Sequence, residues 1–152
     1  MENEEKIRIF YSWQDDLDHK TQKNLIRNII RITLKKIERE TNYKFLLDEA
    51  TRDEPGSPDI SNSIIEKIRI SDIFIGDISI INKKSNSKKK SPNPNVLIEL
   101  GLAIEHLGYS RIIMLFNNKY GDIKKHLPFD IQKNRISEYF VNDHKDKEGK
   151  EK

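Results

Sequence analysis

Cysteine is absent from the sequence, which excludes disulfide bonds, thiol nucleophiles and cysteine-ligated zinc or iron–sulfur clusters. No run of about 18 apolar residues occurs, so no segment is predicted to span a membrane. Residues 1–6 are acidic and lack the apolar stretch of a secretory signal. Together these absences predict a cytoplasmic protein whose hydrophobic core needs no disulfide or metal to stabilise it.

An excess of charge of one sign is also missing. The chain has 28 basic and 25 acidic residues among its 152, for a net charge of +3. Such a small surplus does not predict nucleic-acid binding. Positive charge is concentrated only within residues 83–90, a serine- and asparagine-rich stretch with five lysines. We interpret this stretch as a solvated loop rather than a phosphate-binding patch.

The composition changes near residue 141. Residues 142–152 are almost all charged and present no apolar face, which predicts a disordered tail or a linker. Residues 1–141 are predicted to form one domain, since a chain of this length fits a single hydrophobic core.

Short apolar segments alternate with helical patterns along this domain. Strands are predicted, from β-type or continuously apolar runs, at residues 7–11, 43–47, 72–77, 111–116 and 135–140. Helices are predicted, from apolar residues spaced by three and four, at residues 21–41, 60–68 and 95–107. This order predicts an α/β fold, a flavodoxin-like open parallel sheet of about five strands with helices on both faces.

The carboxyl edge of such a sheet is where ligands bind, and the unusual residues of this sequence follow the strands there. One candidate lies in the helix that begins near Pro94. Asn93 is a plausible N-cap, and Asn95 and Glu99 share a helix face because they are four residues apart. A carboxylate at Glu99 could bind ribose hydroxyls or stabilise an oxocarbenium-like centre. From spacing alone, an acidic residue that only stabilises the start of a helix is the favoured interpretation.

The turn after the first strand is a second candidate. The Ser12 hydroxyl and free backbone N–H groups at a strand–helix turn can hold phosphate. Tyr11 or Trp13 could stack on a base or a nicotinamide ring. The same residues are also typical of packing aromatics beside a turn-forming serine, and the pattern leaves both readings open. No glycine-rich phosphate loop accompanies them.

Two further side chains are weaker candidates. Asp77 follows a strand and could face the cleft, whereas Asp72 at the other end of that strand is interpreted as structural. Arg52 could contact phosphate, although an exposed loop arginine usually has no specific partner. The histidines lack metal-ligand spacing, so no metal site and no cofactor are predicted.

Three segments of the sequence resemble TIR domains. Phe10-Tyr11-Ser12-Trp13 is similar to the first TIR motif, and residues 52–56, Arg-Asp-Glu-Pro-Gly, resemble the second motif with one residue fewer. Residues 93–101, followed by 111–115, resemble the bacterial TIR-like domains of antiphage defence, which include effectors fused to STING and to other cyclic-nucleotide sensors. The likeness extends over residues 6–140, but the third motif and the final helix of the family are missing.

This resemblance implies an NAD⁺ glycohydrolase that breaks the nicotinamide–ribose bond, with NAD⁺ as substrate. By position, Glu99 would be the catalytic glutamate. The residues that would bind substrate are Tyr11, Ser12, Trp13, Arg52, Asp77 and Asn95. The family further implies self-association with other TIR domains, and activation through a fused or separate cyclic-nucleotide sensor. Two alternatives stay open, which are a non-catalytic TIR adaptor and a nucleoside deoxyribosyltransferase-like enzyme.

Overall fold

A five-stranded parallel sheet forms the centre of the computed structural model, which describes residues 5–49 and 60–142. The strands lie in the order β2-β1-β3-β4-β5 and every neighbouring pair is parallel. Their bounds are β1 Lys6–Ser12, β2 Lys44–Glu49, β3 Ile73–Asp77, β4 Ile112–Asn117 and β5 Ile136–Tyr139. The predicted flavodoxin-like sheet is therefore confirmed, with each strand within a few residues of its expected place.

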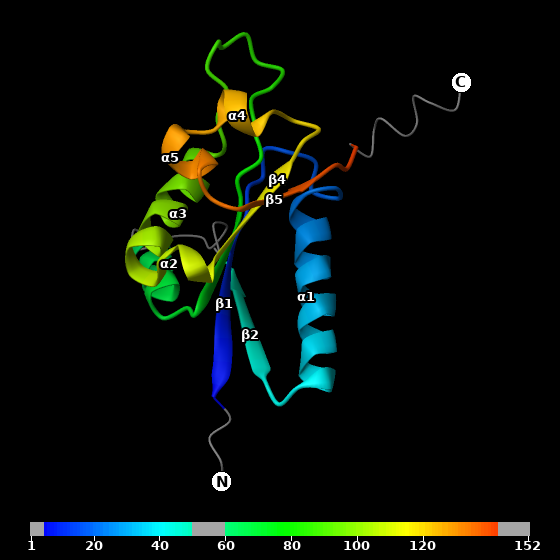
Figure 1. Ribbon diagram of the computed structural model, residues 1–152, viewed down its shortest axis with the longest axis vertical. Coiled ribbons are helices and arrows are strands. Elements are labelled where there is room, and N and C mark those ends of the chain that lie inside the picture. The colour runs from blue at the N-terminus through cyan, green and yellow to red at the C-terminus, as the bar shows by residue number, and fades with distance from the viewer. Residues whose placement is uncertain (1–4, 50–59, 143–152) are drawn as a thin grey trace, which may run out of the picture.

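Helices cover the two faces of the sheet unequally (Figure 1). Helix α1, Lys23–Glu40, lies alone on one face, and α2, Ile60–Arg69, and α3, Pro94–Leu107, lie on the other. A 3₁₀ turn, η1 Tyr109–Arg111, leads into β4. Two short helices, α4 Ile123–His126 and α5 Phe129–Gln132, connect β4 to β5. The sequence does not predict α4 and α5, because four residues are too few to display helical periodicity.

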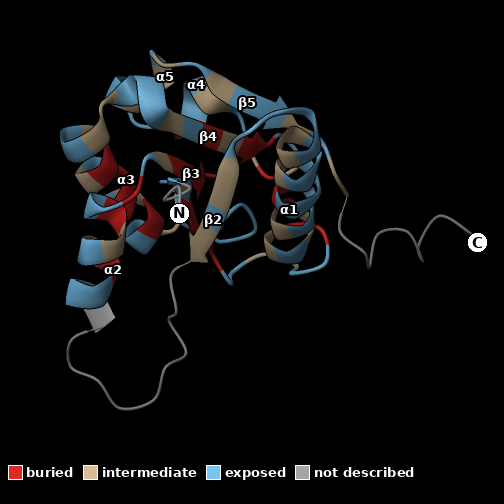
Figure 2. Ribbon diagram, turned by 90° about the horizontal axis from the view of Figure 1, so that it is seen from below, coloured by how far each residue is buried: buried red, intermediate tan, exposed pale blue. Residues whose placement is uncertain are grey.

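Alternating side chains of the central strands divide the hydrophobic core into two clusters. On the α2–α3 face, Phe10 and Phe74 stack with ring centroids 5.9 Å apart and pack with residues such as Ile68 and Leu100. On the α1 face, Ile9 and Tyr11 pack with Ile26, Ile30 and Ile75. Figure 2 shows this buried layer between the exposed outer faces of the helices.

The α1 face is only partly covered. Beside α1 runs an apolar groove of about 650 Å³, whose floor includes Ile73, Ile75 and Leu115. Ile113, also on the floor, remains 43% exposed.

No helix in the described parts of the chain has both the length and the apolar character needed to cross a bilayer.

Helix α3 ends at Gly108, whose φ of 75° is in the left-handed region that glycine adopts without steric cost. The Gly108 N–H donates to the carbonyl of Ile104 and so closes the last turn. This stop directs the chain through η1 into β4.

Candidate functional site

The start of helix α3 lies at the carboxyl edge of the sheet and has the cap that the sequence predicts. Asn93 Oδ1 accepts hydrogen bonds from the backbone N–H groups of Asn95, at 2.8 Å, and Val96, at 3.3 Å. Pro94 is the first residue of the helix, where its missing N–H costs nothing. The cap fixes where the helix begins and hence where Glu99 lies along it.

Glu99 points into the protein rather than into solvent. Its side chain is only 5% exposed, and Oε2 accepts a hydrogen bond from the Ser12 hydroxyl. Ser12 is the last residue of β1, is fully buried, and pairs with Gly76 of β3. Hydrogen bonds to a carboxylate are stronger than those between neutral groups, so Ser12 orients Glu99. The structure thus brings together the two candidate segments predicted from the sequence, the turn after β1 and the start of α3.

A second contact joins the same two segments at the surface. Asn93 Nδ2 donates to Asp16 Oδ2 at 2.7 Å. Asn93 therefore caps α3 with its oxygen and binds the turn after β1 with its nitrogen. Two hydrogen bonds therefore link the β1 end of the chain to α3. Asp16 of the turn binds Asn93 at the start of the helix, and Ser12 binds Glu99 further along it.

Asp77 is fully buried, and uncharged groups surround its carboxylate. Oδ2 accepts from Gln14 Nε2 at 3.0 Å and Gln22 Nε2 at 3.1 Å, and Oδ1 accepts from the Ser79 N–H at 3.0 Å. Burial raises the pKa of Asp77 above its ordinary value, and the hydrogen bonds from Ser79, Gln14 and Gln22 oppose that rise. Asp77 does not face open solvent here, so direct contact with a ligand would need its neighbours to move.

Gln22 extends this buried network across the carboxyl edge to the last two strands. Its Nε2 lies 2.9 Å from Ser79 Oγ and 2.7 Å from the Tyr139 hydroxyl, and its Oε1 accepts from Asn117 Nδ2 at 3.2 Å. Asn117 Nδ2 also donates to the carbonyl of Val141 at 3.0 Å. Burial, followed by the nearby Asp77, raises the pKa of Tyr139. The network connects the start of α1 with β3, β4 and β5.

Gln14, Gln22 and Asn117 were absent from the candidates found by sequence reasoning. Each is fully buried at the carboxyl edge, although glutamine and asparagine are mostly exposed in proteins. The only signal in the sequence was their position close to the end of a strand or to the start of a helix. That position does not show which distant residues they contact.

Tyr11 and Trp13 pack into the α1-side core. Tyr11 is fully buried and its hydroxyl donates to the carbonyl of Lys23 at 3.3 Å. Trp13 is 4% exposed, and Lys23 Nζ lies 3.5 Å from the centroid of its ring. Stacking on a ligand would require these rings to be uncovered. Their role in substrate binding stays a prediction.

The other expected site residues differ in position. Asn95 is exposed on the first turn of α3. Arg52 and the 52–56 segment lie outside the described residues. Asp72, interpreted as structural, accepts a hydrogen bond from the Arg8 N–H at 2.8 Å at the opposite end of β3. Within residues 5–49 and 60–142, no three histidine, aspartate or glutamate side chains gather as a metal site would require.

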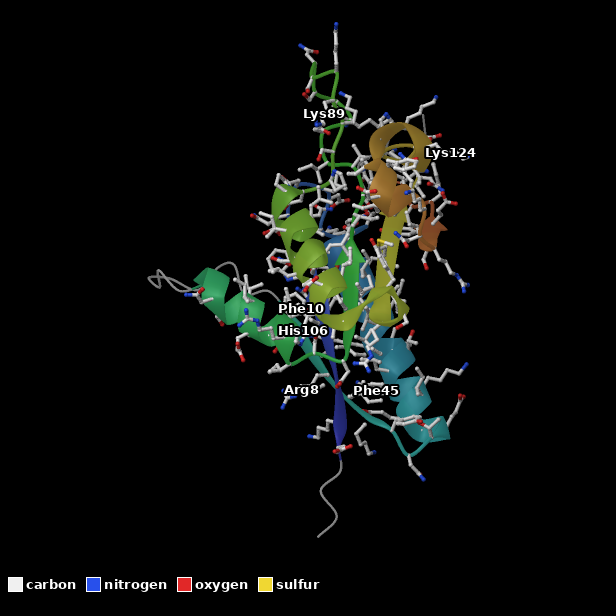
Figure 3. The ribbon with its side chains drawn as sticks, turned by 60° about the vertical axis from the view of Figure 1, so that its left-hand side comes forward. Arg8, Phe10, Phe45, Lys89, His106 and Lys124 are labelled. Carbon is white, nitrogen blue, oxygen red and sulfur yellow. The ribbon has the colours of Figure 1, made fainter. Side chains whose placement is uncertain are left out.

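Lysines surround the same end of the sheet. Lys89, on the loop between β3 and α3, and Lys124, on α4, both project there, while Arg8 and Phe45 lie toward the other end (Figure 3). Lys83 Nζ donates to the carbonyl of Lys119 at 2.6 Å and so ties that loop to the β4–α4 connection. The loop is exposed over most of residues 83–89, as expected for a solvated segment.

Comparison with known proteins places these observations in a family. The family model described as "CAP12/Pycsar effector protein, TIR domain" matches residues 9–132. No curated protein matches the chain. Among solved structures, a 2-desoxiribosyltransferase from Leishmania mexicana is similar at 20% sequence identity with a TM-score of 0.49. That similarity covers 73% of this chain, and this chain spans 65% of that protein. The family match extends from β1 to α5 and includes Ser12, Asp77 and Glu99, so the chain belongs to the TIR domains of CAP12/Pycsar effector proteins, a family of bacterial antiphage defence.

Proposed function

We propose that this chain is an NAD⁺ glycohydrolase effector domain that cleaves the nicotinamide–ribose bond after self-association with other TIR domains. The observation that carries the proposal is the Glu99 carboxylate, held by Ser12 at the carboxyl edge of the sheet in a member of this family. Activation by a cyclic-nucleotide sensor, fused or separate, is part of the same proposal. Its support is the family description.

In the proposed reaction, the bond between ribose C1′ and the nicotinamide nitrogen breaks, and its electron pair leaves with nicotinamide. Positive charge then develops on C1′ and the ring oxygen. A fixed carboxylate stabilises such an oxocarbenium-like centre. Water attacks C1′ and loses a proton, so the products are nicotinamide, ADP-ribose and one proton.

Ser12 has a defined part in this proposal. Its hydroxyl occupies one lone pair of Glu99 Oε2, which holds the carboxylate in one orientation. The carboxylate has further lone pairs that a ribose hydroxyl can use. Ser12 therefore positions Glu99 and leaves it able to bind substrate.

The burial of Glu99 is relevant to the need for self-association. At 5% exposure, the carboxylate is accessible to a ribose only after local rearrangement. A neighbouring TIR domain that binds the rearranged state would raise its population. A single isolated domain would then have low activity.

The same burial favours one alternative. A glutamate that is paired with Ser12 and hidden from solvent is also what a non-catalytic TIR adaptor would have, with Glu99 serving only to join α3 to β1. The adaptor would assemble with other TIR domains and leave NAD⁺ intact.

The test compares dilute protein with protein clustered on a bead surface. Both are incubated with NAD⁺, and nicotinamide release is followed by chromatography. The proposal expects release from the clustered sample and little from the dilute one. Intact NAD⁺ in both samples would favour the adaptor. Base exchange on deoxynucleosides without attack on NAD⁺ would indicate a deoxyribosyltransferase-like enzyme instead.

A further inference from the structure

We propose that Asp77 is a positioning residue, which acts through Gln14 to hold the turn at residues 13–18 and thereby keeps Ser12 directed at Glu99. Its bearing on catalysis rests on the function proposed above, whereas its structural part does not. This role differs from the direct substrate contact that the sequence suggested for Asp77.

The carboxylate of Asp77 accepts hydrogen bonds from N–H groups whose positions are fixed by the backbone or by further hydrogen bonds. The Ser79 N–H belongs to the backbone, and it donates to Oδ1 at 3.0 Å. Gln14 Nε2 donates to Oδ2 at 3.0 Å. Both carboxylate oxygens therefore face N–H groups. An asparagine at this position would place an NH₂ group against one of those donors.

Gln14 transmits the position of Asp77 to the turn. While its Nε2 donates to Asp77, its Oε1 accepts from the backbone N–H groups of Asp16, at 2.8 Å, and Leu17, at 2.9 Å. An acceptor on one side and backbone donors on the other allow only one orientation of the amide. The Gln14 side chain thus bonds β3 to the turn.

Residues 13–18 also contact α3, the helix that carries Glu99. Asp16 Oδ2 accepts from Asn93 Nδ2 at 2.7 Å, and Asn93 caps α3. Ser12, directly before the turn, donates to Glu99. These contacts form a closed ring from the turn through Asn93 and α3 to Glu99 and back to Ser12, and Gln14 links this ring to Asp77. Such a ring holds its members more rigidly than separate contacts would.

Removing the carboxylate of Asp77 has a local consequence. In Asp77→Asn, we expect the side-chain oxygen to face the Ser79 N–H, which is fixed in the backbone, so that the NH₂ group faces Gln14. Gln14 then loses its acceptor, and the Asp16 and Leu17 N–H groups lose a fixed partner. The turn then samples other conformations. Ser12, directly before the turn, then spends less time hydrogen-bonded to Glu99.

The first test measures amide hydrogen exchange by NMR and needs no catalytic activity. In Asp77→Asn, exchange at Asp16 and Leu17 should accelerate by about tenfold or more relative to amides within α1, because the opening is local. Asp72→Asn, at the other end of β3, is the matched control and should leave this ratio unchanged. Equal acceleration throughout the protein, or none at Asp16 and Leu17, would overturn the proposal.

The second test is a double-mutant cycle on clustered protein. Asp77→Asn should lower kcat between about tenfold and about a hundredfold, with little change in KM. Added to Ser12→Ala, it should cost less than about threefold more, since both substitutions remove the same contact. A full additional loss would show that Asp77 acts independently of Ser12.

If Asp77→Asn does not fold, Gln14→Met serves in its place, because it removes the Gln14 side of the same hydrogen bond to Asp77. It should show the same lack of additivity with Ser12→Ala. If no variant and no wild-type protein releases nicotinamide while the exchange result holds, the proposed reaction fails and the positioning role stands. If wild type is active and the exchange ratio does not change, the positioning role fails alone.

Discussion

The two ends of strand β3 carry the same residue type in contrasting surroundings. Asp72, at the amino end, is exposed and accepts one hydrogen bond from the Arg8 N–H. Asp77, at the carboxyl end, is fully buried and accepts from Gln14, Gln22 and Ser79. An exposed carboxylate that extends a strand ladder contributes little free energy, whereas a buried one requires every partner it has.

Polar contacts like those at the carboxyl end of β3 extend to other strands along the carboxyl edge of the sheet. At the carboxyl end, Gln22, directly before α1, bonds to Asp77 of β3, Asn117 of β4 and the half-buried Tyr139 of β5. In the same region, Ser12 of β1 bonds to Glu99. Such networks specify one arrangement and are costly to leave half satisfied. The comparison indicates that hydrogen bonds at the carboxyl edge hold its side chains in fixed positions. Catalysis requires reacting groups to be fixed in this way.

Ser12→Ala should produce the largest effect of the substitutions that probe this contrast. Without the hydroxyl, Glu99 loses the donor that orients it, and nicotinamide release by clustered protein should fall by about tenfold to a hundredfold. Ser110→Ala, at an exposed serine of the amino end, is the matched control and should keep full activity. Equal losses in both variants would remove the distinction between the two ends.

Gln22→Met should mainly affect stability. Methionine fills the space of glutamine but removes the hydrogen bonds that Gln22 makes with Asp77, Tyr139 and Asn117. The free energy of unfolding, measured with urea, should fall by about 1–3 kcal/mol. A change within about 0.5 kcal/mol, the usual range for surface positions, would mean that the network does not stabilise the edge.

The pKa of Asp77 predicts a dependence of stability on pH. Because burial raises this pKa in the folded state, the folded protein keeps the proton where the unfolded chain has released it. The free energy of unfolding should therefore fall as pH rises from the ordinary aspartate value toward the raised pKa, by at most about 1.4 kcal/mol per pH unit. Asp77→Asn cannot titrate and should lack this decrease. Unfolding curves from about pH 4 to 7 that differ between the two proteins by a constant amount would contradict the assignment.

Asp72→Asn should have the smallest effect. The side chain is exposed and its single contact to Arg8 is accessible to water. The expected loss is about 0.5 kcal/mol or less, measured as a shift of the urea midpoint. A loss as large as that of Gln22→Met would show that the two ends of β3 are equally important to the fold.

The fold was predictable because periodicity is a local property. Ile26 and Ile30 are spaced as a helix requires, and the continuous apolar run Ile73–Ile75 is typical of a parallel strand covered on both faces. The position of Glu99 on its helix was predictable because Asn93 and Pro94 define where that helix begins. Each inference needed only residues close together in sequence.

The buried network was not predictable, because its contacts join residues far apart in the chain. Gln22 lies 55 positions from Asp77 and 117 from Tyr139, and no alternation or spacing relates them. Tyr11 and Trp13 fitted both stacking and packing, and the structure places them in the core. Only the arrangement of the sheet decides such cases.

The most direct measurement of the central claim compares Glu99→Gln with Glu105→Gln on clustered protein supplied with NAD⁺. Both residues lie on α3, but Glu99 is buried beside Ser12 and Glu105 is exposed. Glutamine at position 99 can still accept the Ser12 hydrogen bond but carries no charge, so nicotinamide release should fall by about a hundredfold or more. Glu105→Gln should match wild type. Equal rates in Glu99→Gln and wild type would contradict a catalytic role for the buried carboxylate.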